Sequence, residues 1–269
     1  MRRVIIDTDT AGDDTIALLT AMHHFKVEGV TITGGNVDFD QEVENALYTI
    51  QVANPEEGHA VDFIIEKIKE YPGEVSLLAI APLTNIAMAI KKDPSIIKDI
   101  PHIYIMGGTN NTLGNITPAA EYNFYVDPEA AKLVLHSGIP ITMVGWDMCI
   151  DYSIMDDNDH AEIADLETAG SQFFIDINRV VMQFNKSVHR LNGTTHPDTL
   201  LVAIAADERI IVKSHDYYVD VETKGELTRG YSLVDVNNRL EKEPNVRVCE
   251  AVDRGRFKKN LFDVLVAIK

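Results

Sequence analysis

A short apolar strand that leads through an acidic turn into a helix constrains the fold of this chain more than any other feature. Residues 4–6 are Val and Ile without alternation, which predicts a strand buried on both faces of a sheet. The helical pattern of residues 14–25 follows at once. A buried strand followed directly by a helix is typical of folds with a parallel sheet. The start of the chain therefore predicts an α/β fold.

Four carboxylates lie in this stretch, and no lysine or arginine stands among them: Asp7, Asp9, Asp13 and Asp14. An ordinary helix cap, helped by the helix dipole, explains one or two of them. Capping does not explain Asp7 and Asp9, which lie at the carboxyl end of the strand, where open α/β sheets bind ligands. Because unpaired buried charge is costly, we favour a metal or catalytic cluster that holds a hard divalent cation.

The composition narrows the classes of function. The chain has 269 residues, 45% of them apolar, which suits one domain spanning residues 1–269. Its 24 basic and 42 acidic residues give a net charge of −18, which disfavours nucleic acid and anionic membranes as partners. Cys149 and Cys249 are too few for a disulfide framework or a cysteine metal site. Without a signal peptide or a membrane-spanning apolar run, we expect a cytoplasmic protein.

Strand and helix patterns alternate through the first two thirds of the sequence, which predicts a mostly parallel, doubly wound sheet with helices on both faces. The predicted strands are residues 4–6, 27–33, 75–81, 103–106, 139–144 and 246–252, with a further candidate at 209–212. The predicted helices are residues 14–25, 41–53, 60–69, 86–91, 128–137, 159–190, 199–206 and 257–268. Residues 217–222 and 231–236 alternate, which predicts a small antiparallel excursion near the C-terminus.

Polar side chains recur where the predicted strands end. Asn36 and Asn85 follow two of them, and a long loop after another leads through Asn115 to Glu121 and Asn123. Because parallel strands share a direction, we expect these segments to meet at one edge of the sheet. If residues 121–123 are extended, Glu121 and Asn123 point to the same side. Each asparagine alone is more often a turn residue, but amides and a carboxylate around a metal suit a polyhydroxylated substrate such as a sugar.

The ordered set of motifs resembles the inosine–uridine-preferring nucleoside hydrolase family. Residues 7–14 (Asp-Thr-Asp-Thr-Ala-Gly-Asp-Asp) are similar to its N-terminal Asp-x-Asp-x-x-x-Asp-Asp motif. The likeness continues in order through residues 35–36, 82–87, 106–108, 114–115, 120–123, 127–131 and 140–144. The resemblance implies hydrolysis of the N-glycosidic bond of purine or pyrimidine ribonucleosides to free base and ribose, with a calcium ion under the ribose.

The resemblance also implies a role for each residue of the site. The calcium ligands would be the side chains of Asp9, Asp14 and Asp198 and the backbone carbonyl of Thr84. Asp13 would be the general base that activates the attacking water, and Asp7 would support the cluster from behind. The residues that contact the ribose would be Asn36, Met106, Asn115, Glu121 and Asn123. We expect a homodimer or homotetramer that takes a small-molecule nucleoside.

Two departures from the family pattern leave the recognition of the base open. The family often has His or Trp immediately before the last metal-binding Asp, whereas here Pro197 precedes Asp198 and His196 lies one place further back. His196 is therefore a candidate acid for the departing base, with an ordinary loop histidine as the alternative. The connection at residues 54–59 is also shorter than in the family.

Two other functions fit part of the sequence. Residues 7–10 are close to the Asp-x-Asp-x-Thr start of haloacid-dehalogenase-like, magnesium-dependent phosphatases. That alternative leaves Asp13, Asp14 and Asp198 without a role, and the net charge of −18 disfavours anionic substrates. A calcium-stabilised sugar-binding protein without catalysis is the other alternative.

Overall fold

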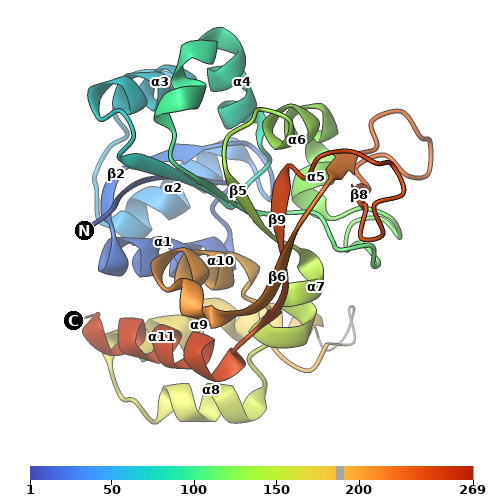
Figure 1. Ribbon diagram of the computed structural model, residues 1–269. Coiled ribbons are helices and arrows are strands. Elements are labelled where there is room, and N and C mark those ends of the chain that lie inside the picture. Colours follow the sequence, from blue (N-terminus) through green and yellow to red (C-terminus); the bar gives the residue numbers. More distant parts are fainter. Residues whose placement is uncertain (186–190, 269) are drawn as a thin grey trace.

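A seven-stranded sheet lies between two layers of helices in the computed structural model, which describes residues 1–185 and 191–268 (Figure 1). The strand order is β2-β1-β3-β4-β5-β9-β6, and only the pairing of β6 with β9 is antiparallel. The strands of this sheet are β1 (Arg3–Thr8), β2 (Lys26–Ile32), β3 (Val75–Ala79), β4 (Ile103–Met106), β5 (Ile141–Val144), β6 (Ile211–Tyr217) and β9 (Val246–Val252). A separate antiparallel pair is formed by β7 (Val219–Val221) and β8 (Ser232–Val234).

Helices cover both faces of the large sheet. One layer contains α3 (Ala60–Glu70), α4 (Thr84–Lys92) and α6 (Pro128–Leu135), and the other contains α1 (Gly12–His24), α10 (Pro197–Ala206) and α11 (Arg254–Ala267) (Figure 1). The remaining helices are α2 (Phe39–Ile50), α5 (Tyr122–Val126), α7 (Trp146–Met148), α8 (Asp157–Ala164) and α9 (Ala169–Phe184).

The first strand shows why its apolar run is unbroken. Ile5 packs into the hydrophobic cluster under α3, α4 and α6, whereas Val4 and Ile6 pack into the cluster under α1, α10 and α11. Successive side chains of a strand point to opposite faces, so both faces of β1 need apolar residues. The predicted mostly parallel, doubly wound sheet and its antiparallel excursion are confirmed.

Several predicted boundaries differ from the structure. Helix α1 begins at Gly12, which brings Asp13 and Asp14 into its first turn. The helix predicted over 159–190 is two helices, because Thr168 caps α9 by accepting the backbone N–H of Ser171; residues 186–190 lie outside the described residues. The strand expected at 209–212 begins only at Ile211, after a 3₁₀ turn over Glu208–Ile210.

The strand order places a topological switch point at the edge where the candidate site lies. Strand β1 has β2 on one side and β3 on the other, so the connections that leave β1 and β3 diverge. Open α/β sheets bind their ligands beyond the carboxyl ends of strands at such a switch point. The acidic turn after β1 and the start of α4 after β3 both lie there.

Two expectations drawn from composition concern thiols and membranes. Cys149 and Cys249 are both free, and both are buried. Within residues 1–185 and 191–268, no helix combines the length and the apolar character needed to cross a membrane.

Candidate active site

Two helix N-termini bring three carboxylates together. Asp13 and Asp14 lie in the first turn of α1, and Asp198 lies in the first turn of α10, directly after Pro197. Each offers one carboxylate oxygen, and these oxygens lie within 4.8 Å of one another. The positive ends of both helix dipoles are therefore close to this negative charge and stabilise it in part.

Asp9 is the fourth acid of the cluster. It is fully buried at the end of β1, and its Oδ2 accepts the backbone N–H of Asn36 at 3.1 Å. Its Oδ1 is buried and has no hydrogen-bond partner among the described residues. The charge of Asp9 also contributes to the electrostatic surroundings of Asp198, so the four acids form one cluster.

Asp7 lies behind this cluster. Its carboxylate accepts hydrogen bonds from the side chains of Thr31, Thr33 and Asn85 at 2.5, 2.9 and 3.0 Å. Burial raises its pKa to about 6, and these hydrogen bonds oppose that change. Asp7 thus joins β1 to β2 and to the first turn of α4.

Burial raises the pKa values of all four clustered acids, and repulsion from neighbouring carboxylates adds to this for Asp9, Asp14 and Asp198. Burial, with the charges of Asp14, Asp13 and Glu42, raises the pKa of Asp9 to about 9. Burial and the charge of Asp13 raise the pKa of Asp14 to about 7. The pKa values of Asp13 and Asp198 are also raised, mainly by burial. Such a cluster of oxygen donors fits a hard divalent cation, which would relieve the repulsion between the carboxylates. The cation would also bind Asp9 Oδ1, which has no partner among the described residues.

Glu121 and Asn123 form hydrogen bonds with the backbone at the end of β4. The extended segment expected over residues 121–123 is not present, because the chain becomes helical at Tyr122. Glu121 is the N-cap of α5, and its side chain accepts the backbone N–H groups of Asn123 and Phe124. Its Oε2 also accepts the N–H of Gly108 at 2.9 Å, and Asn123 Nδ2 donates to the carbonyl of Met106 at 3.0 Å. A capping carboxylate satisfies the free N–H groups of the first helical turn. The alternation of side chains along an extended segment does not predict this role. Burial raises the pKa of Glu121 to about 7.

The two other asparagines lie on exposed loops. Asn36 lies between β2 and α2, where its backbone contacts Asp9. Asn115 lies in the loop before α5, and its Oδ1 accepts the backbone N–H of Tyr122 at 2.9 Å. Asn36 is thus bonded directly to Asp9, an acid expected at the site. Asn115 is bonded to Tyr122, the residue that follows Glu121 in the sequence.

Thr84 and His196 are both engaged elsewhere through their side chains. The Thr84 hydroxyl donates to Asp127 Oδ2 at 2.7 Å, so only its backbone carbonyl is left for the role that was expected. His196 is 0% exposed, its Nε2 lies 2.8 Å from Thr194 Oγ1, and its ring centroid lies 4.9 Å from that of Phe174. Burial lowers the pKa of His196 to about 3, so the ring is neutral.

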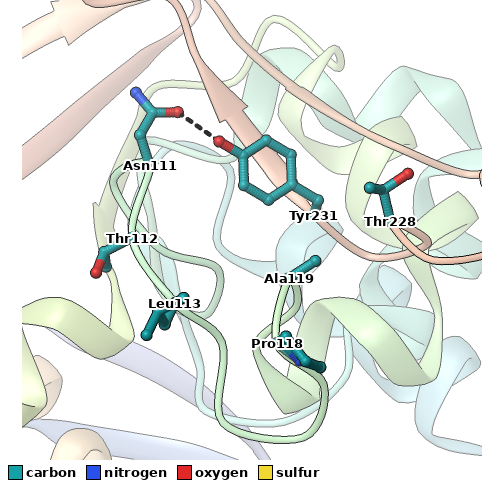
Figure 2. Close-up of a pocket in the computed structure, with 7 residues that line it drawn as sticks. All are labelled: Asn111, Thr112, Leu113, Pro118, Ala119, Thr228 and Tyr231. Carbon is teal, nitrogen blue, oxygen red and sulfur yellow. Dashed lines mark hydrogen bonds between the residues drawn. The ribbon is translucent and has the colours of Figure 1, made fainter.

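A pocket of about 490 Å³ borders the loop that carries Asn115 (Figure 2). In it the Tyr231 hydroxyl donates to Asn111 Oδ1 at 3.1 Å. Its lining residues are Asn111, Thr112, Leu113, Pro118, Ala119, Thr228 and Tyr231. None of the residues expected at the site lines this pocket.

Glu42 is a further charged residue near the cluster that the sequence motifs did not indicate. It is fully buried in the first turn of α2 and contributes to the raised pKa of Asp9. The spacing of Glu42, Ala46 and Thr49 places all three on the buried face of the helix, and this periodicity was a usable signal.

Comparisons with known proteins agree with the fold. The model of the family described as inosine-uridine preferring nucleoside hydrolase matches residues 4–57 and 50–259, and the two segments meet in the short connection between α2 and α3. An uncharacterized protein of Schizosaccharomyces pombe is 32% identical, with 98% of this chain and 97% of that protein covered. Uridine nucleosidase 1 of Arabidopsis thaliana is 31% identical, with 87% and 82% covered. The structure of a purine-preferring ribonucleoside hydrolase from Gardnerella vaginalis has a TM-score of 0.90 at 27% identity, with 98% of both chains covered.

Proposed function

This chain belongs to the inosine–uridine-preferring nucleoside hydrolase family, whose members are N-ribosyl hydrolases, and we propose that it is a calcium-dependent ribonucleoside hydrolase. The observation that supports calcium is the acid cluster at the switch point of the sheet, with its buried, unpartnered Asp9 Oδ1. Family membership also argues against the phosphatase alternative, which the Asp-x-Asp-x-Thr motif alone had left open.

The ion would be held by the carboxylates of Asp9, Asp14 and Asp198 and by the carbonyl of Thr84. All of these donors are oxygen atoms, which calcium prefers and of which it takes six to eight. When bound, calcium supplies positive charge that binds the sugar hydroxyls and lowers the pKa of water. The protein supplies the fixed carboxylates that favour positive charge on the ribose as the glycosidic bond breaks.

Asp13 is the general base in this proposal. It is the only one of the four acids that is partly exposed, so an attacking water has access to it. A carboxylate that takes the proton of the water as the water attacks the anomeric carbon is sufficient for this step. Asp9 has a carboxylate oxygen without a partner among the described residues, and matched variants of Asp9 and Asp13 separate their roles.

The proposal covers purine and pyrimidine ribonucleosides. The names of similar proteins point both ways, since one is a uridine nucleosidase and another a purine-preferring hydrolase. The cytoplasmic location and the homodimer or homotetramer remain predictions.

The reaction is tested by following products from inosine, uridine and a phosphate monoester. We expect free base and reducing sugar from at least one nucleoside, and no inorganic phosphate from the ester. Phosphate release without nucleoside cleavage would contradict the proposal, and binding of nucleoside without turnover would favour the sugar-binding alternative.

Asp198→Ala should weaken calcium binding at least about tenfold, because the affinity of such sites depends on the number of charged ligands. Calorimetric titration with calcium measures the change, and activity should partly return at high calcium. Asp207→Ala, at the other end of α10, is the matched control and should leave the affinity unchanged. An unchanged calcium affinity in the Asp198 variant would show that this ligand is misassigned.

His196→Gln tests the acid expected for the leaving base. Because the ring is enclosed and neutral, we expect it to support the packing around Asp198 rather than to donate a proton. The variant should then lose activity by the same factor on nucleosides and on p-nitrophenyl riboside, whose leaving group departs without protonation. A loss confined to nucleosides, on the scale of about a hundredfold that acid catalysis contributes, would restore the acid role.

A further inference from the structure

Glu42 is a buried carboxylate to which the mechanism assigns no role. It is 0% exposed in the first turn of α2, and the hydrogen bonds it accepts from described residues come only from backbone N–H groups. Its Oε1 accepts the N–H of Gly35 at 2.9 Å and that of Val37 at 3.4 Å, and its Oε2 has no partner among the described residues. Burying a charge in this way is costly unless the interactions it makes are needed.

The two N–H groups that Glu42 binds flank Asn36. The N–H of Asn36 itself is bound by Asp9 Oδ2 at 3.1 Å, so two carboxylates hold three successive backbone amides. The turn also approaches Asp9 closely, because a Cβ atom on Gly35 would lie 2.1 Å from Asp9 Oδ2. Hydrogen bonds from backbone N–H groups to carboxylates are stronger than neutral ones.

We propose that Glu42 is a positioning residue that fixes the turn of Asn36 against Asp9. The proposal rests on the proposed function and on the ribose contact that the family resemblance implies for Asn36. The side chain of Asn36 is exposed, so its own packing does not hold it in place. Glu42 instead fixes the backbone on both sides of it. Without this support, the asparagine would have to be ordered when the substrate binds, and substrate affinity would fall.

Three variants separate the effect of the length of the Glu42 side chain from the effect of its charge. Glu42→Asp keeps the charge, but its shorter side chain cannot reach both amides. Glu42→Gln keeps the reach and one carbonyl oxygen, but removes the charge. Glu44→Ala removes an exposed acid two residues along the same helix and is the matched control.

A positioning role predicts a rise in KM for Glu42→Asp of about tenfold, with kcat within about threefold of wild type. Glu42→Gln and Glu44→Ala should stay within about threefold of wild type in both constants. Equal KM values for Glu42→Asp and wild type would contradict the proposal. So would a Glu42→Gln variant that is impaired while Glu42→Asp is not, because Glu42 would then act through its charge on an ion or hydroxyl.

Hydrogen exchange of the Gly35 and Val37 amides provides a readout that does not depend on turnover. Exchange should be faster in Glu42→Asp than in wild type or Glu44→Ala. If wild type proves inactive on nucleosides but this difference in exchange appears, the proposed function fails, whereas the positioning of the Asn36 turn by Glu42 is supported. Unchanged exchange in Glu42→Asp, with wild type active, would contradict the positioning role of Glu42 and leave the proposed function intact.

Discussion

Asp13→Asn is expected to reduce kcat on ribonucleosides by at least about a hundredfold, the usual scale for the removal of a general base. The amide keeps the size and shape of the carboxylate but cannot take a proton from water. Because Asp14, Asp198 and Asp9 remain, calcium binding should fall much less than turnover. The measurement is single-turnover hydrolysis at saturating calcium, with calcium affinity determined on the same preparation.

Asp9→Asn is the matched comparison, because Asp9 has a carboxylate oxygen without a partner among the described residues. If Asp9 is a ligand and Asp13 the base, Asp9→Asn should weaken calcium binding and recover activity as calcium is raised. Near-normal turnover in Asp13→Asn, together with a loss in Asp9→Asn that calcium does not restore, would transfer the role of base to Asp9.

Nucleosides that lack the 2′-hydroxyl should be poor substrates, with kcat/KM lower by factors on the order of ten-thousandfold in the most favourable case. The two hydroxyls of a ribose are natural oxygen ligands for an ion held by Asp9, Asp14 and Asp198. Loss of one hydroxyl would also leave the polar groups arranged around the sugar without a partner. Glu121 is our main candidate for enforcing this, since it is 2% exposed and is fixed by backbone N–H groups.

The test compares kcat/KM for matched ribonucleosides and 2′-deoxyribonucleosides at saturating calcium. A base-matched pair removes any contribution from the leaving group. Comparable values would mean that the ion does not bind the sugar diol, and the assigned ribose contacts would fail even though the fold and family are established.

The architecture could be predicted because burial leaves a pattern in the sequence. Strands buried on both faces contain uninterrupted apolar residues, as residues 4–6 do, and turns between them contain the polar residues. Three acids of the cluster, Asp9, Asp13 and Asp14, could be predicted because four carboxylates in eight residues are hard to explain without a cation. Both of these signals are local, so one sequence is enough to detect them. Asp198 is distant in sequence and was expected only from the resemblance to the family.

What could not be predicted depends on contacts between distant segments. The ring of His196 lies against that of Phe174 in α9, and the immediate sequence of His196 does not show this contact. Glu121 becomes a helix cap because α5 starts there, which removes the extended geometry that had been expected. Glu42 could have been placed on a buried helix face by its spacing, but not beside Asp9, because that contact joins α2 to the end of β1.

Release of ribose from a nucleoside panel, measured before and after removal of divalent ions, tests the central claim most directly. Wild-type protein should produce reducing sugar and free base from inosine or uridine, lose this activity in the presence of a chelator, and regain it when calcium is added back. Full activity after exhaustive chelation would contradict the claim that the cluster of Asp9, Asp13, Asp14 and Asp198 works with a bound calcium ion.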